Sequence, residues 1–353
     1  MKLYLIDLFE RFKRATITKK LLFLFIFLIQ VFLLVISLVK VNVEITTPGT
    51  LNNPVQNITI EDSNDRGYIA SVSIFSYSKV SLIQYWLSKN NYKFNVDEIN
   101  ESYYLNEKDE LTQGKIMKDN STTLALINAY KYASFKDSSI TIDLDSLYLG
   151  ESVISIYSFA KTTLQYNDLI IKVNGESFNN YQEMLELVTK FNEKVLRFTV
   201  IRDEKESVET AELVNHDGKS SYGFGVDACY KVPVTNPKYE IEYSYKVIGP
   251  SAGAITALAI YNMLVNEDIT KGYKITGTGT IDFDGNIGAI GGIEQKILTA
   301  KLYGVDIFFV DSGDYIDAQD AYNKYECDFK LVSVSNFSEM INYLDNLEVK
   351  NGN

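Results

Sequence analysis

The most apolar stretch of the chain lies near its N-terminus, from Leu21 to Val39. It reads LLFLFIFLIQVFLLVISLV, and Gln30 is its one clearly polar residue. A helix needs about twenty apolar residues to cross a bilayer, so the stretch predicts a transmembrane helix over residues 21–39. The competing interpretation is a cleaved signal peptide, whose apolar core is about 7–15 residues long and precedes a small-residue cleavage site. The residues after Leu38 offer no such site, so we expect an uncleaved anchor.

Basic residues precede the apolar stretch: Arg11, Lys13, Arg14, Lys19 and Lys20. Lysine and arginine stay on the cytoplasmic side of a membrane span, so we expect residues 1–20 to form a cytoplasmic tail. Everything after Lys40 is then expected outside the cell. The pattern predicts a single-pass protein of the cell membrane with an extracellular functional part.

Between the apolar stretch and residue 135 the pattern changes twice. Residues 41–65 are polar and rich in turn formers, which is typical of a stalk. Gly67 to Tyr77 alternates with a period close to two and predicts a strand, whereas Thr122 to Ala133 is apolar at helical spacing. The charged, tyrosine-rich segment between them indicates no particular chemistry. We expect residues 40–135 to form an N-terminal ectodomain region.

Short elements follow one another between residues 136 and 214. Asn167 to Gly175 predicts a strand that ends in an Asn-Gly turn, Tyr181 to Phe191 a helix, and Val195 to Arg202 an alternating strand. This order of strands around one short helix predicts a β-rich unit.

One motif in this unit resembles a known family. Leu164 to Gly175, LQYNDLIIKVNG, is similar to the L-x-x-G-D-x-I-x-x-V-N-G signature of PDZ domains, with Asn167 in place of the usual glycine. The resemblance implies a PDZ-like domain over residues 136–214 that binds extended peptides by adding them to a sheet edge. Gly150-Glu-Ser-Val153 is the nearest match to the carboxylate-binding loop of that family. A small β-rich spacer without a ligand is the alternative.

A serine stands at a predicted helix entry in the second half of the chain. A sharp Gly249-Pro250 turn opens an alanine-rich apolar helix, and Ser251 follows in its first turn. A hydroxyl there lies beside free backbone N–H groups and the positive end of the helix dipole, which can stabilise an oxyanion. From this segment alone, the simpler interpretation is that Ser251 caps the helix while Ala252 and Gly253 permit close packing.

A lysine stands at the edge of a second predicted helix. Gly277 to Gly288 predicts a strand, an Asp-Gly turn and a strand, and Ala289 to Gly304 predicts a helix that ends at a glycine. Lys296 borders the buried stripe of this helix, where partial desolvation lowers the pKa of a lysine and makes a neutral amine available as a base. Lys301 lies on another face and is expected to be a solvated charge.

The scarcity of histidine and cysteine limits the chemistry. His216 is the one histidine and lies in a polar stretch that predicts a loop, so a multi-histidine metal site is excluded. Cys229 and Cys327 form no C-x-x-C pair, which argues against structural zinc. We expect two separate buried thiols, although an oxidising exterior would permit a disulfide. No metal site is predicted.

The charge and the glycine-rich segments exclude two further classes of function. The formal net charge is −12, and an acidic surface repels phosphate backbones, so nucleic-acid binding is not expected. The chain contains neither a G-x-x-x-x-G-K-[ST] loop nor a G-x-G-x-x-G motif after a strand. We therefore expect no nucleotide and no other cofactor.

The serine and lysine segments together resemble the proteolytic domain of Lon proteases. Gly249-Pro-Ser-Ala-Gly253 is similar to the segment that carries the nucleophile of that family, and Ile290-Gly-Gly-Ile-Glu-Gln-Lys296 to the segment that carries its catalytic lysine. The resemblance implies a dyad of Ser251 and Lys296, an oxyanion turn formed by Gly249, Pro250, Ala252 and Gly253, and a supporting threonine. Thr278 fits that threonine better than Thr276 by its spacing, and Ile248 replaces an acidic residue that is frequent in Lon proteases.

The order of the segments resembles the PDZ-containing, membrane-anchored Lon-like proteases of Gram-positive bacteria and their wall-less relatives. The resemblance implies a mixed α/β (α+β) ectodomain with a Lon-type proteolytic domain over residues 215–347. It also implies an ATP-independent serine endopeptidase that cleaves extracellular or membrane-proximal peptides and unfolded segments through an acyl-enzyme. The PDZ-like domain would recruit substrate or gate the site. The resemblance is also compatible with a homo-oligomer. The alternative is a catalytically inactive PDZ-bearing envelope protein that binds partners as a scaffold.

Overall fold

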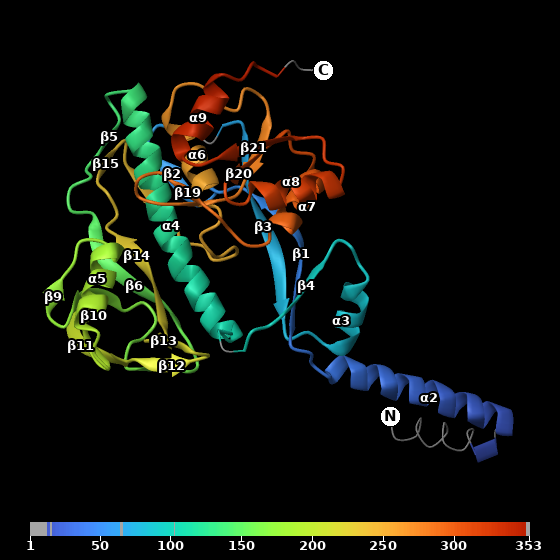
Figure 1. Ribbon diagram of the computed structural model, residues 1–353. Helices are drawn as coiled ribbons and strands as arrows, with labels where there is room; N and C mark the ends of the chain where they lie inside the picture. The colour runs from blue at the N-terminus through green and yellow to red at the C-terminus, as the bar shows by residue number, and fades with distance from the viewer. Residues whose placement is uncertain (1–12, 15, 64–65, 102, 351–353) are drawn as a thin grey trace. The chain divides into compact units, whose positions relative to one another are not determined.

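The computed structural model describes residues 13–14, 16–63, 66–101 and 103–350 (Figure 1). The chain divides into two compact units. The first unit comprises Met1–Thr47 and Phe75–Ile99, and the second comprises Pro48–Ile74 and Asn100–Asn353. Strands β1 (Val43–Asn52) and β3 (Tyr68–Ser78) each continue from one unit into the other.

The first unit begins with the apolar helix α2 (Ile17–Leu38), none of whose residues is buried. Its 22 residues, and the mean hydropathy of 3.1 over its most apolar 18 residues, make it long and apolar enough to cross a membrane, and a signal sequence has the same properties. The helix starts four residues before the predicted span, so Lys19 and Lys20 lie within its first turn. Arg11 and most of the predicted cytoplasmic tail lie outside the described residues.

Helix α3 (Leu82–Lys89) and strand β4 (Asn95–Glu98) complete the first unit. The side chains of Ser81 and Gln84 form a capping box that starts α3. Strand β4 pairs antiparallel with residues 43–46 of β1. The sequence pattern assigned no element here because the segment is short and polar.

The second unit contains a sheet in which β21 (Lys330–Val334), β20 (Ile307–Asp311), β17 (Lys274–Gly277), β3 and β1 follow one another. Strands β21, β20, β17 and β3 run parallel. Side chains of β20 alternate between two hydrophobic clusters: Ile307 and Phe309 join one cluster, Phe308 and Val310 the other. The sheet is therefore buried on both faces, as parallel sheets usually are.

Helices cover both faces of this sheet (Figure 1). One cluster includes residues of α4 (Glu107–Lys136), α6 (Gly253–Leu264) and α9 (Phe337–Asp345). The other includes residues of α7 (Ile293–Tyr303) and α8 (Tyr315–Lys324). Residues 68–136 thus supply a strand and a long helix to the same core as residues 253–345.

A seven-stranded antiparallel sheet forms the other large element of the second unit. Its order is β14 (Phe224–Tyr230), β6 (Tyr148–Ile156), β8 (Leu169–Val173), β10 (Val195–Arg202), β11 (Lys205–Glu212) and β7 (Lys161–Thr162), and β9 (Glu176–Ser177) pairs with β8. Helix α5 (Tyr181–Phe191) packs on its core through Met184. This sheet continues past residue 214, where the predicted PDZ-like domain ends, because β14 pairs along the length of β6.

Short strand pairs complete the described part of the second unit. They are β2 (Ile58–Ile60) with β16 (Tyr239–Ile241), β5 (Thr141–Ile142) with β15 (Thr235–Asn236), β12 (Val214–His216) with β13 (Lys219–Ser221), and β18 (Thr280–Ile281) with β19 (Ile287–Gly288). The predicted mixed α/β fold is confirmed. His216 ends strand β12, so its predicted place in a loop is wrong, and Cys229 and Cys327 are free thiols.

Candidate active site

Ser251 lies in the turn that precedes α6 and does not cap the helix. The helix begins at Gly253, its N-cap residue is Ala252, and no side chain caps it. The interpretation of Ser251 as an N-cap is therefore wrong. Gly249 has a φ of +89°, a backbone conformation that favours glycine, and it allows the chain to turn sharply into Pro250 and Ser251.

Residues 278 and 279 hold the main chain of Ser251. The carbonyl oxygen of Ser251 accepts hydrogen bonds from the backbone N–H of Gly279 (2.9 Å) and from Thr278 Oγ1 (3.1 Å). The N–H of Ala254 in turn donates to the carbonyl of Gly279 (3.1 Å). Within the described residues, the N–H groups of Ser251 and Ala252 have no acceptor, so they are available to a negatively charged oxygen near the serine.

Helix α4 braces the same turn from the other side. The N–H of Gly249 donates to the carbonyl of Gly114 (2.8 Å), and Ser121 Oγ donates to the carbonyl of Pro250 (3.1 Å). A Cβ atom at Gly253 would lie 2.7 Å from Ser121 Oγ, so the close approach requires glycine. The roles of Gly114 and Ser121 were not predicted from the sequence. A glycine inside a helix usually has a packing reason, and Gly114 was the available signal.

Lys296 is buried on α7, and its amine reaches the threonine that holds Ser251. Its side chain is 3% exposed, and Nζ donates to Thr278 Oγ1 at 3.0 Å. The Thr278 hydroxyl gives its own proton to the Ser251 carbonyl, so towards the amine it acts as an acceptor. A neutral amine that donates to Thr278 keeps its lone pair for another partner.

Burial makes the lysine a base near neutral pH. Desolvation lowers the pKa of Lys296 from 10.5 to about 8, and the negative charge of Asp314 opposes the shift. Gly292, which has a φ of +69°, begins the helix that carries the lysine. A Cβ atom at Gly292 would lie 2.5 Å from Ile74, so this glycine lets the start of α7 pack closely.

Thr276, Lys301 and His216, which the sequence also offered, have partners outside this site. Thr276 is buried as well, but its hydroxyl donates to the carbonyl of Ala70 at 2.6 Å. Lys301 is exposed, and its amine donates to the carbonyls of Tyr325 and Glu326 near the end of α8, so it is more than a solvated charge. His216 stacks on Phe159 with ring centroids 4.3 Å apart.

Ser251, Thr278 and Lys296 thus form one connected group. The link runs from the Ser251 carbonyl through the Thr278 hydroxyl to the Lys296 amine. Among the described residues, no hydrogen bond joins Ser251 Oγ directly to Lys296 Nζ. Gly249, Pro250, Ala252 and Gly253 surround the serine in the turn and at the start of α6.

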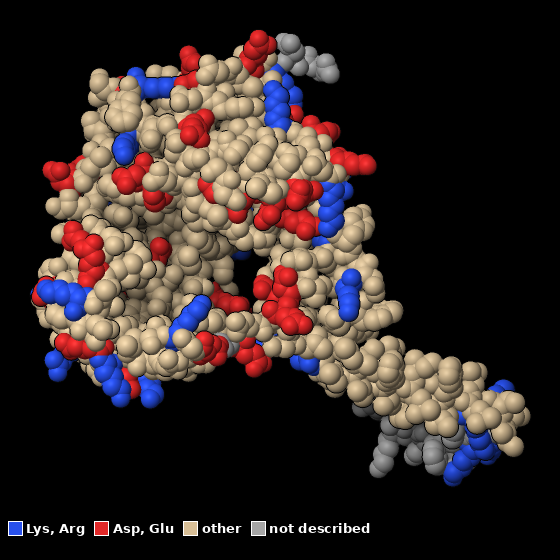
Figure 2. Space-filling model, viewed as in Figure 1, with Lys and Arg blue, Asp and Glu red and all other residues tan. Residues whose placement is uncertain are grey.

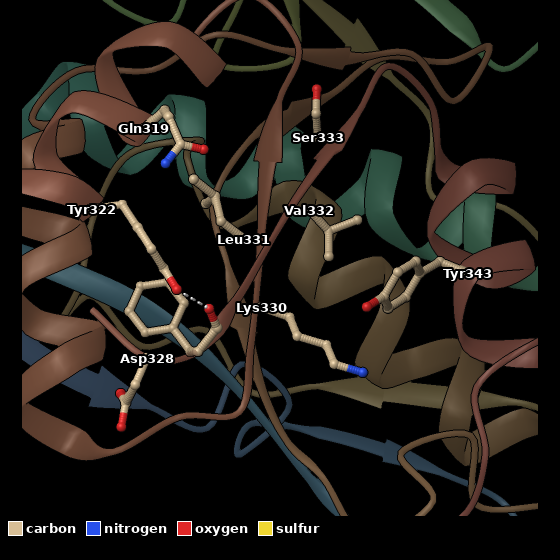
Figure 3. Close-up of a pocket in the computed structure, with 9 residues that line it drawn as sticks. Gln319, Tyr322, Asp328, Lys330, Leu331, Val332, Ser333 and Tyr343 are labelled. Carbon is tan, nitrogen blue, oxygen red and sulfur yellow. Dashed lines mark hydrogen bonds between the residues drawn. The ribbon is translucent and has the colours of Figure 1, made fainter. Parts of the chain in front are cut away.

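A separate hollow lies against the outer strand β21 of the sheet. Figure 3 shows Tyr322 and Lys330 among its lining side chains, and the Tyr322 hydroxyl donates to the carbonyl of Phe329 at 2.8 Å. The lining comes from α8, β21, the two residues before β21, and α9. Neither Ser251 nor Lys296 takes part, so this hollow is distinct from the candidate active site.

Known proteins resemble the part of the chain that holds this group. Residues 244–345 match the family described as the Lon protease (S16) C-terminal proteolytic domain. The match supports a serine-type peptidase. Ser251, Thr278 and Lys296 all lie within the matched residues.

Curated Lon proteases match over short segments. The Lon protease of Aster yellows witches'-broom phytoplasma (strain AYWB) is 33% identical over 92 residues, which are 26% of this chain and 11% of that protein. The archaeal Lon protease of Methanocaldococcus jannaschii is 27% identical over 124 residues, 34% of this chain and 18% of that protein. The Lon protease of Finegoldia magna is 31% identical over 93 residues, 26% and 12% of the two chains. The chain spans less than a fifth of the length of these relatives.

A solved structure resembles about a quarter of the chain. It is the PDZ domain of the SdrC-like protein from Listeria monocytogenes, which is 20% identical and covers 24% of this chain and 93% of that one. The TM-score is 0.20, which is too low to assign a fold.

Proposed function

We propose that this chain is a serine endopeptidase in which Ser251 is the nucleophile and Lys296 the general base. The observation that carries the proposal is the buried Lys296 amine, whose pKa falls to about 8 and which is joined through Thr278 to the turn of Ser251. A lysine in this state can accept a proton near neutral pH. The Lon-type match over residues 244–345 supports the same assignment.

In the proposed mechanism, neutral Lys296 takes the proton of the Ser251 hydroxyl as Oγ bonds to the carbonyl carbon of a peptide. The N–H groups of Ser251 and Ala252 hold the oxyanion. Lys296 then gives its proton to the leaving amine, the C–N bond breaks, and an acyl-enzyme remains. The Lys296 amine next deprotonates a water molecule, which attacks the carbonyl carbon of the ester. The C–Oγ bond breaks, Lys296 returns the proton to Ser251 Oγ, and the new carboxyl end of the peptide leaves.

Thr278 has a positioning role in this proposal. Its proton is committed to the Ser251 carbonyl, so its oxygen can only accept from the lysine and holds the amine beside the serine turn. The amine lone pair is then free to face Ser251 Oγ. Catalytic hydrogen bonds are often long or absent without substrate and shorten when substrate binds, so we expect the Ser251–Lys296 contact to form in the complex.

We propose extended or unfolded peptide segments as substrates, cleaved without ATP. The seven-stranded sheet is the proposed PDZ-like element that recruits them. Gly150 is paired within β6 opposite Cys229, so it is a poor candidate for a carboxylate-binding loop. Gly223-Phe-Gly225 is the candidate we propose instead: Gly223 precedes β14, and Phe224 and Gly225 begin that strand, which is the outer strand of the sheet. An outer strand can accept a peptide as an added strand.

The activity is tested with the full chain in lipid nanodiscs and casein or a fluorogenic peptide library as substrate. We expect cleavage by the native chain, and its loss in Ser251→Ala and in Lys296→Ala. Lys301→Ala, on the same helix, is the matched control and should retain activity. Cleavage by all variants would contradict the dyad, and cleavage by none would favour the inactive scaffold.

We also propose that α2 is an uncleaved membrane anchor, with residues 1–20 on the cytoplasmic side and the chain after Lys40 outside the cell. Its length, its apolar composition and the basic residues before it support this placement. We expect a protease added outside intact cells to remove a C-terminal epitope. Protection of that epitope until the cells are lysed would contradict the placement.

A further inference from the structure

Helix α3 of the first unit exposes large apolar side chains. Trp86 is 66% exposed, Leu87 59% and Leu82 37%. At 3.6 residues per turn, these residues and the half-buried Ile83 share one side of the helix, and the buried Ser88 lies on the other side. A single exposed leucine is ordinary, but an apolar side on a helix of eight residues indicates a contact with something apolar.

The attachment of α3 to α2 indicates what the apolar side of α3 contacts. The N–H of Leu82 donates to the carbonyl of Val39 (2.8 Å), and the N–H of Val41 donates to the carbonyl of Val80 (2.9 Å). The start of α3 is therefore fixed to the C-terminal end of α2 (Figure 1). A helix of 22 residues is roughly 33 Å long, close to the roughly 30 Å of a bilayer's hydrocarbon core. Where α2 leaves the membrane, α3 lies at the boundary between lipid and water.

The side chains on and after α3 have the chemistry of that boundary. Tryptophan and tyrosine concentrate at membrane interfaces, and Trp86 and the exposed Tyr92 belong to these types. Lys89 lies three residues after Trp86, with its amine 5.5 Å from the ring centroid of Tyr85. A lysine at this position can extend to lipid phosphates while its stem stays in apolar surroundings.

Along α2, Figure 2 shows a largely uncharged surface with basic residues gathered at its N-terminal end. If α2 is the proposed anchor, lipid surrounds this apolar band and reaches the place where α3 is attached. We propose that α3 is an interfacial helix whose Leu82, Trp86 and Leu87 insert into the headgroup–acyl boundary of the bilayer that α2 spans. This inference rests on the proposed membrane anchor.

Trp86 is the one tryptophan of the chain, so the intrinsic tryptophan fluorescence of the unmodified protein reports on α3 alone. The full chain is reconstituted into vesicles of phosphatidylcholine, either plain or brominated at shallow acyl positions. We expect at least a twofold loss of Trp86 fluorescence in the brominated vesicles and protection of Trp86 from iodide. Full emission in brominated vesicles together with quenching by iodide would overturn the proposal.

Flotation of the vesicles separates this inference from the anchor on which it rests. Absence of flotation would contradict the anchor and the interfacial helix together. Flotation without bromine quenching would contradict the interfacial helix alone. Protection from iodide without bromine quenching would assign the apolar side to a second copy or a protein partner instead of lipid, which also overturns the proposal.

Paired variants complete the test. The double variant Leu82→Glu with Leu87→Glu should lose at least half of the bromine quenching, because two charges oppose insertion into the boundary. Ile316→Glu is the matched control, since Ile316 is 73% exposed but lies on α8 in the second unit. It should leave the quenching unchanged. Equal quenching in the double variant and the control would contradict insertion through these leucines.

Discussion

The seven-stranded sheet and the region of residues 244–345 each bury a charged side chain, but under opposite conditions. In the sheet, Asp168 is 1% exposed and receives two hydrogen bonds from Arg202, from Nε and Nη2, both at 2.6 Å. In the other region Lys296 is 3% exposed, and its described hydrogen-bond partner is the neutral hydroxyl of Thr278. One buried charge is paired, and the other is not.

This difference indicates that Asp168 has a structural role and Lys296 a role in chemistry. A buried ion is costly unless a partner of opposite charge and further hydrogen bonds compensate its lost hydration. Asp168 has such a partner, and the hydrogen bond to Asp168 raises the pKa of Arg202. Lys296 has its pKa lowered to about 8 by burial, a state that destabilises the folded chain and suits a base. We infer that the lysine is retained for its chemistry.

The largest expected effect comes from removing the unpaired charge. Lys296→Met should lower kcat/KM for peptide cleavage by about 1,000-fold, within the range of general-base contributions. It should also stabilise the chain at pH 7. Because the pKa of folded Lys296, about 8, lies below the unfolded value of 10.5, the native chain gains stability as pH rises through that window. The advantage of the variant is therefore greatest below pH 8 and disappears near pH 10.5.

Peptide-cleavage kinetics at pH 8 and urea unfolding between pH 7 and pH 10.5 measure both effects. Lys301→Met, which removes an exposed lysine of the same helix, should change neither the activity nor the pH dependence of stability. Two results would contradict the claim that Lys296 is kept for its chemistry at a cost in stability. One is undiminished activity of Lys296→Met, and the other is a stability below that of the native chain at pH 7.

The paired charge gives the next largest effect, on stability. Arg202→Met leaves the buried Asp168 carboxylate without its partner and should destabilise the seven-stranded sheet by about 3 kcal/mol, the lower end for a broken buried pair. Hydrogen exchange of the β8 and β10 amides should become faster. Adding Asp168→Asn should restore most of the loss, because an amide oxygen can still accept from the N–H of Gln165. Unchanged exchange in Arg202→Met would show that the pair does not stabilise the sheet.

Much of this contrast could be predicted from the sequence. The place of Lys296 beside the apolar stripe of a helix indicated a desolvated amine, and the spacing of Thr278 favoured it over Thr276. The structure brings Thr278 and Lys296 into contact and leaves Thr276 bound to Ala70. The roles of Ser251, Thr278 and Lys296 stay predictions until the variants are measured.

Long-range contacts account for what the sequence analysis missed. Only the apolar half of α4 was predicted, because residues 107–121 are mostly polar and their helix is held by tertiary contacts such as Gly114 with Gly249. Strand β14 was missed because its partner β6 lies far earlier in the chain. A local pattern of apolar residues shows which face of a single helix or strand is buried. It gives no information on the contact of Gly114 with Gly249 or on the pairing of β14 with β6.

A smaller effect is expected from the neutral partner of Lys296. Thr278→Val keeps the shape of the side chain but removes both the acceptor of the amine and the donor to the Ser251 carbonyl, so kcat/KM should fall by about 10- to 100-fold. The pH midpoint of activity should also move to lower pH, because the hydroxyl oxygen stabilises the ammonium form. Thr276→Val, two residues earlier in β17, is the control and should leave the midpoint unchanged. A fall in activity without a shifted midpoint would indicate a merely structural role for Thr278.

The smallest expected effect comes from Asp314, the carboxylate whose charge acts on Lys296. The charge of Asp314 raises the pKa of Lys296 against the effect of burial, so Asp314→Asn should move the midpoint of the pH–activity profile to lower pH. Asparagine can keep the hydrogen bond that Asp314 accepts from the N–H of Ile290 at 2.8 Å, so the loop before α7 should stay in place. Asp320→Asn removes an exposed carboxylate of α8, the helix whose N-cap is Asp314. It should leave the midpoint of the pH–activity profile unchanged. A shift to higher pH in Asp314→Asn would mean that the titrating group is not a lysine held beside this carboxylate.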